Sequence, residues 1–147
     1  MEMRVKLTYL LDTNTFSYAV TGRSPAARAR FRCLLQDSGV NVCISAITEA
    51  EIRFGMAWRK PSPMRSFIIE STLAKIEILP WDSEAAVVYG GVRAALRARG
   101  TTVGPLDLLI AAHAASTSAI LVTHDSIFSR IAEITGIRAI TDWATDL

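Results

Sequence analysis

Cysteine is scarce in this 147-residue sequence, which contains Cys33 and Cys43 and no third cysteine. The two residues form no CxxC pair, and they are too few for the disulfide framework of a small secreted domain. Both lie in apolar stretches, "RCLL" and "NVCIS", so we expect each thiol to be a buried core side chain. This usage is typical of a reduced, intracellular protein, and we expect a cytoplasmic one.

Long apolar runs are absent as well. No stretch approaches the ~18 consecutive apolar residues of a membrane-spanning helix. The N-terminal "MEMRVKLTYLL" carries charges at Glu2, Arg4 and Lys6, and its apolar run is too short for a signal peptide. We therefore expect neither a membrane segment nor a secretory leader.

The sequence also lacks a strong excess of charge of one sign, because sixteen Lys and Arg residues face fourteen Asp and Glu, a net charge of +2. Nearly all the basic residues are arginine, whose guanidinium fork suits phosphate groups. A pI near 8.7 permits a nucleic-acid partner but does not indicate one. A GC-rich genome explains the arginine bias equally well.

Apolar material, in contrast, is plentiful. Half of the residues are hydrophobic, 20% are charged and the mean hydropathy is +0.29. This is enough for a sizeable core in one domain that spans residues 1–147.

Short apolar runs alternate with helix-like segments along the chain. Apolar runs of strand length occupy residues 7–11, 40–44, 76–79, 119–123 and 137–140. Helical patterns occupy roughly residues 24–37, 46–59, 62–74, 83–99, 105–117 and 126–134. This alternation predicts an α/β domain with a mainly parallel central sheet of about five strands, flanked by helices on both faces.

Helix boundaries are marked by familiar residues. Pro61 and Pro63 separate two helices. Asp82 or Ser83 is placed to cap the helix over residues 83–99, which we expect to end at Gly100. Pro105 then begins the next helix.

Lone carboxylates stand at the junctions between these elements. Asp12 follows the first predicted strand, Glu49 and Glu51 follow the second, Asp107 lies in the first turn of an apolar helix, and Asp125 follows the fourth strand. The carboxyl ends of parallel strands meet at one crevice, so these acids converge there. Unpaired carboxylates would repel one another, and a divalent cation such as Mg²⁺ or Mn²⁺ relieves that repulsion.

Each acid also has a structural explanation. Asp12 and Asp125 are placed to cap the helices that follow them, and Asp107 complements a helix dipole. Glu51 follows Thr48 by three residues, which fits a capping box. Asp107 fits its structural role least well, because a carboxylate at the mouth of a buried helix needs a partner.

The motifs "LLDTNTFSY", "ISAITEAEIRFG", "GPLDLLIAAHA" and "LVTHDSIFSRI" in this order resemble those of the PIN-domain ribonucleases, and among them the VapC-type toxins of toxin–antitoxin pairs. The resemblance extends from about residue 8 to residue 143. Each motif alone is weak, but four in order at these spacings are highly specific. The resemblance implies a three-layer PIN fold and a metal-dependent endoribonuclease that uses Mg²⁺ or Mn²⁺.

The resemblance also implies residue roles. Asp12, Glu51, Asp107 and Asp125 correspond to the four acids that hold the metal and carry catalysis. Thr123 matches the hydroxyl residue before the last acid, and Asn14 the polar residue after the first. Glu49 matches no invariant acid, so we expect it at the surface or rim. Arg53 and Arg130 lie near the predicted crevice and are candidates for a phosphate clamp or for contacts to a partner's acidic tail.

Partners follow from the same resemblance. The implied partners are an RNA substrate, a VapB-like antitoxin that blocks the site with a C-terminal segment, and a second copy in a homodimer; DNA would be contacted only through the antitoxin. Two segments, "FRCLL" (31–35) and "IRFGMAW" (52–58), are candidates for an exposed apolar interface. The main alternative is a catalytically silent PIN-fold module that acts in a protein complex.

Other side chains have weaker claims on function. Arg93 and Arg97 share a helix face and belong either to a phosphate-binding surface or to a solvated one. His113 lies on the far side of its helix from Asp107, so we expect a core or interface histidine rather than a catalytic base.

Overall fold

The computed structural model describes residues 5–147; the predictions for Glu2 and Arg4 lie outside this range. Five strands and eight helices occur within it. They match the predicted pattern except that the last helical segment is divided in two and that the helix after Asp12, expected only as the one that Asp12 would cap, is a further helix. In chain order they are β1 (Leu7–Leu11), α1 (Thr13–Thr21), α2 (Pro25–Leu35), β2 (Val40–Ser45), α3 (Ala46–Arg59), α4 (Pro63–Leu73), β3 (Glu77–Leu79), α5 (Ser83–Ala98), α6 (Pro105–Thr117), β4 (Ile120–Val122), α7 (Ile127–Arg130), α8 (Ala132–Thr135) and β5 (Ala139–Thr141).

The strands form one sheet in the order β3-β2-β1-β4-β5, and each neighbouring pair is parallel. β1 lies at the centre, where the chain first adds β2 and β3 on one side and later β4 and β5 on the other. Leu11 is level with Ile44 of β2 and with Val122 of β4. The residues that follow these three strands therefore emerge together at one edge, beside the point where the strand order reverses.

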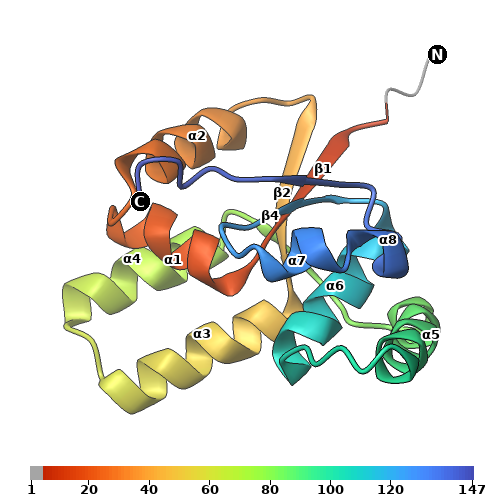
Figure 1. The fold of residues 1–147 in the computed structure, drawn as a ribbon. Helices are drawn as coiled ribbons and strands as arrows, with labels where there is room; N and C mark the ends of the chain where they lie inside the picture. Colours follow the sequence, from red (N-terminus) through yellow and green to blue (C-terminus); the bar gives the residue numbers. More distant parts are fainter. Residues whose placement is uncertain (1–4) are drawn as a thin grey trace.

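Successive strand residues point to opposite faces of the sheet, and each face has its own core. Leu11, Ile44 and Val122 pack in one cluster with residues of α1 and α2. Leu10, Cys43 and Leu121 pack in the other with residues of α5 and α6. Figure 1 shows α1, α2 and α4 on one side of the sheet and α5 to α8 on the other. The predicted α/β fold with helices on both faces is confirmed.

The predicted helix boundaries are largely confirmed. Asp82 caps α5, because its Oδ1 accepts a hydrogen bond from the Ala85 N–H at 3.1 Å. Gly100 follows α5 with φ +67°, a left-handed conformation that glycine adopts without strain. Pro105 is the first residue of α6, and Pro61 and Pro63 separate α3 from α4.

Two predictions about apolar residues are wrong. The segment "FRCLL" is not an exposed interface, since Phe31 and Leu34 are buried against the sheet. Cys33 in the same helix is exposed instead of buried, because its neighbours take the inward-facing positions of α2. Cys43 is buried as predicted, and burial raises the pKa of its thiol to about 12.

Within residues 5–147 no helix combines the length and the hydropathy that a membrane crossing requires.

Candidate active site

Asp12 is the residue directly after β1 and is buried, with 5% of its surface exposed. Its Oδ1 accepts a hydrogen bond from the Thr15 N–H at 2.8 Å, so it caps α1 as the structural explanation requires. Its Oδ2 accepts a hydrogen bond from the Thr123 hydroxyl at 2.6 Å. Burial raises the pKa of Asp12 despite these hydrogen bonds, and the nearby charge of Asp125 adds to the increase. Asp12 therefore both caps α1 and belongs to the acidic site.

Thr123 connects Asp12 to Asp125 at the end of β4. Its hydroxyl donates to Asp12 and accepts a hydrogen bond from the Asp125 N–H at 3.0 Å. Asp125 is exposed, and its Oδ1 accepts from the Ile127 N–H at the start of α7 at 3.0 Å. The loop after β4 thus holds both side chains in a fixed relation to Asp12.

Glu51 does not belong to a capping box. α3 is capped by Ser45, whose Oγ accepts from the Ile47 N–H at 3.1 Å, so Thr48 already lies inside the helix. The Glu51 carboxylate instead reaches α1, where its Oε1 accepts a hydrogen bond from the Thr13 hydroxyl at 2.7 Å. Thr13 was not predicted as a site residue, although its position directly after Asp12 is a sequence signal for one.

Asp107 lies in the first turn of α6 and is half-buried. The cap residue, Gly104, has no side chain; a Cβ there would lie 3.3 Å from Asp107 Oδ2, closer than ordinary contact. Burial and then the negative charges of Asp125, Asp12 and Glu51 raise the pKa of Asp107. A helix dipole alone would favour the charged form, so burial and the surrounding carboxylates together outweigh it.

The four predicted acids are therefore brought together at one edge of the sheet, close enough to act on one another's charge. Among residues 5–147, however, no three Asp, Glu, His or Cys side chains stand at metal-ligating distance. One or two carboxylates together with water are enough to hold a hard divalent cation, so three direct protein ligands are not required. The donor set is oxygen-only and carries uncompensated negative charge, so it fits a hard divalent cation.

The remaining predicted residues differ in their surroundings. Asn14 is exposed on α1 beside Thr13. Arg53 is engaged in ion pairs with Glu49 at 2.9 Å and with Glu70 at 3.0 Å, which leaves its guanidinium poorly placed for a phosphate clamp. Glu49 is half-buried and forms an ion pair with Arg53. Arg130 is exposed at the end of α7, the short helix that follows Asp125.

His113 is a core histidine, as predicted. The ring is buried, and its Nδ1 lies 2.7 Å from the hydroxyl oxygen of Ser45, the residue that caps α3. Because Ser45 Oγ accepts from the Ile47 N–H, its hydroxyl hydrogen is free to donate to Nδ1. Burial lowers the pKa of His113, opposed by the Asp82 charge and the Pro80 carbonyl. The neutral imidazole thus joins α6 to the junction between β2 and α3.

Replacing His113 by leucine tests this role. We expect His113→Leu to destabilise the fold by about 1–3 kcal/mol at pH 7.5, because the Ser45 hydroxyl loses its buried partner. Below the usual histidine pKa of 6.5 the unfolded chain binds a proton that the folded chain resists, so wild-type stability falls as pH decreases. The variant will lack this contribution. Urea unfolding at pH 7.5 and 5.5 measures both effects. A variant as stable as wild type at pH 7.5 would contradict the first, and equal pH slopes for the two proteins would contradict the second.

Comparison with known proteins identifies the family. The family model of the PIN domain matches residues 9–134, which include all four acids. The chain belongs to the PIN-domain family. Its sequence is 37% identical over 138 residues to the tRNA(fMet)-specific endonuclease VapC of Salmonella typhimurium, covering 93% of this chain and 98% of that protein. It is 36% identical over 120 residues to ribonuclease VapC2 of Haemophilus influenzae, covering 81% and 87% of the two chains.

Solved structures agree with this family assignment. The PIN domain described here superposes on VapBC2 from Rickettsia felis bound to a promoter DNA fragment with a TM-score of 0.81 and 27% identity, covering 93% of this chain and 99% of that chain. DNA-bound VapBC from Salmonella typhimurium gives a TM-score of 0.75 and 32% identity, with 93% and 98% covered. The predicted relationship to VapC-type PIN domains is confirmed.

Proposed function

We propose that this PIN-domain chain is a metal-dependent endoribonuclease and the toxin of a VapBC-like toxin–antitoxin pair. The observation that carries the proposal is the convergence of Asp12, Glu51, Asp107 and Asp125 at the carboxyl edge of the sheet, in a chain similar to VapC ribonucleases over nearly its whole length. We place its activity in the cytoplasm.

The acids have distinct roles in this proposal. Asp12 and Asp107 would hold Mg²⁺ or Mn²⁺, and Asp125 would support the site from the loop after β4. When bound, the ion lowers the pKa of a water molecule and neutralises charge on the phosphate. The chain's own residues supply orientation: the Thr15 N–H and the Thr123 hydroxyl fix both oxygens of Asp12. Thr13 holds Oε1 of Glu51, so Oε2 would remain free to orient a water molecule by accepting its hydrogen bond.

The first RNA to test is tRNA(fMet), because two relatives, from Salmonella typhimurium and Shigella flexneri, are named for cleaving it. We expect hydrolysis of a phosphodiester bond that leaves a 5′-phosphate and a 3′-hydroxyl.

We further propose that the antitoxin binds in a groove of about 810 Å³ between α1, α3 and α4. Glu51 and Thr13 lie at the groove, so a segment bound there reaches the acids. Phe54 and Trp58 line it and are 67% and 76% exposed, with their rings stacked at 6.4 Å. Structural neighbours that are complexes with antitoxins support this choice of occupant. Contact with promoter DNA would be made by the antitoxin, and we propose a homodimer of the toxin.

Metal removal tests the function. We expect purified, antitoxin-free protein to cut tRNA(fMet) into discrete fragments with Mg²⁺ or Mn²⁺, to stop in EDTA, and to resume when metal is restored. The same preparation of Asp12→Asn controls for contaminating nuclease. Equal cleavage by both proteins would show contamination. A folded protein that leaves total cellular RNA intact would favour the silent binding module instead.

A further inference from the structure

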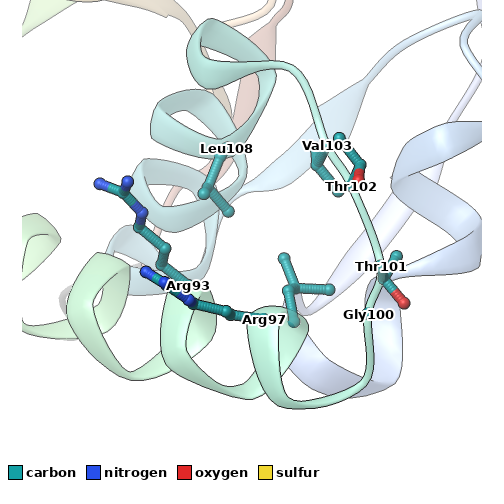
Figure 2. Close-up of a pocket in the computed structure, with 8 residues that line it drawn as sticks. Arg93, Arg97, Gly100, Thr101, Thr102, Val103 and Leu108 are labelled. Atoms are coloured by element: carbon teal, nitrogen blue, oxygen red, sulfur yellow. The ribbon is translucent and has the colours of Figure 1, made fainter.

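A second cavity lies away from the groove, where α5 ends and the loop to α6 begins. Its volume is about 300 Å³. Figure 2 shows Arg93 and Arg97 on α5 with their guanidinium groups extending away from the segment of Thr101, Thr102 and Val103, which lines the opposite side of the cavity. Leu96 and Leu108 also line it, and no acidic residue does. The cavity therefore combines two positively charged side chains with apolar lining residues.

The two arginines lack carboxylate partners. Among residues 5–147 the ion pairs involve Arg53 and His124 but neither Arg93 nor Arg97. Arg93 is nevertheless held in place, because its guanidinium donates to the Tyr89 hydroxyl at 3.1 Å and lies 5.9 Å from the Tyr89 ring centre. Two like charges one helical turn apart repel, so this arrangement destabilises the isolated helix slightly. The helix dipole stabilises a cation in the last turn of α5, where Arg97 lies. Arg93 precedes that turn and gains little from the dipole.

The cavity adjoins the acidic site through α6. The loop that forms its far wall runs directly into Gly104 and the first turn of α6. Leu108 lines the cavity, while Asp107, its neighbour in sequence, senses the charges of Asp125, Asp12 and Glu51. Since consecutive helical residues point about 100° apart, Leu108 and Asp107 face different directions from the same turn of α6.

We propose that this cavity, the Arg93–Arg97 pocket, binds a backbone phosphate of the RNA strand beside the phosphate that is cleaved. Guanidinium groups bind phosphate oxygens in a bidentate manner, and neither arginine has a carboxylate partner in the described part of the chain. The proposal rests on the proposed ribonuclease function and adds a substrate-positioning site to it. In this proposal Arg93 and Arg97 take the phosphate-binding role that the sequence suggested for Arg53, because Arg53 is paired with two carboxylates.

Binding to in vitro transcribed tRNA(fMet) in EDTA tests the pocket without cleavage. The double variant R93Q/R97Q is compared with wild type and with R99Q, which removes an exposed arginine at the same helix end but outside the cavity. We expect Kd for R93Q/R97Q to rise about 10-fold at 0.1 M salt and the slope of log affinity against log salt to fall by about 1. R99Q will match wild type, and R93K/R97K will recover part of the affinity.

Cleavage kinetics give a second readout. With Mg²⁺ we expect R93Q/R97Q to raise KM about 10-fold and to leave kcat within about 2-fold of wild type, as expected for lost uniform binding. If R93Q/R97Q and R99Q bind and cleave alike, the pocket proposal is wrong while the ribonuclease function stands. If wild-type protein neither binds nor cleaves any RNA, the proposed function fails and this proposal fails with it. Loss without recovery in R93K/R97K, accompanied by a lowered melting temperature, would make the pocket structural and also overturn the proposal.

Discussion

Asp107→Asn is expected to lower RNA cleavage about 1,000-fold and, without metal, to make the folded protein more stable than wild type. A 1,000-fold loss corresponds to about 4 kcal/mol of transition-state stabilisation, a reasonable value for a side chain proposed to hold the metal directly. The amide has the shape of the carboxylate but carries no charge, so it disturbs the first turn of α6 little.

The stability gain follows from the raised pKa of Asp107. Because burial and three neighbouring carboxylates raise this pKa in the folded state, the folded chain retains the proton to a higher pH than the unfolded chain. Stability therefore falls as pH rises from the usual Asp pKa through the folded one, and the full cost remains at neutral pH. Asparagine removes the ionisation and with it this cost, at the expense of activity.

Thermal unfolding in EDTA and in Mg²⁺ separates the two effects. Wild-type protein should gain melting temperature when Mg²⁺ is added, because the ion binds the folded state. Asp107→Asn should start higher in EDTA and gain less. A variant that melts below wild type in EDTA would contradict the account of an uncompensated acidic site, and full cleavage activity would remove Asp107 from the site altogether.

Most of the fold could be predicted from sequence because its elements are marked locally. The run "LTYLL" is a strand over the predicted residues, and Gly100 and Pro105 mark a helix end and a helix start where expected. The last segment was less clear, since the predicted helix over 126–134 is divided into α7 and α8 and β5 begins at Ala139. Short elements have few residues with which to show a period.

The positions of the four acids were also readable, because each follows a strand or opens a helix. The side chains that hydrogen-bond to these acids could not be predicted, because Thr13 and Glu51 are 38 residues apart and Thr123 and Asp12 are 111 apart. The capping box at Thr48 failed for a related reason. Ser45 ends β2 and caps α3 at once, and only the strand's length, set by pairing with β1 and β3, decides where the helix begins.

The double substitution Phe54→Ala and Trp58→Ala is expected to release the toxin from its antitoxin. A segment that fills the groove between α1, α3 and α4 would bury these two stacked rings, which are now mostly exposed. Truncating an aromatic anchor at the centre of an interface costs about 2 kcal/mol, or roughly 30-fold in affinity. We expect the pair together to weaken inhibition by about 100-fold or more.

Phe67 offers a matched control for this experiment. It is 71% exposed on α4 and does not line the groove, so Phe67→Ala removes a similar apolar ring without touching the proposed contact. The proposed VapB-like antitoxin is titrated into RNA cleavage by each protein, and the inhibitory concentration is normalised to the uninhibited rate of that protein. Unchanged inhibition of the double variant would place the antitoxin elsewhere. A change from dimer to monomer with inhibition intact would make this groove the contact between two toxin copies, because the rings would then be buried by a second chain rather than by the antitoxin.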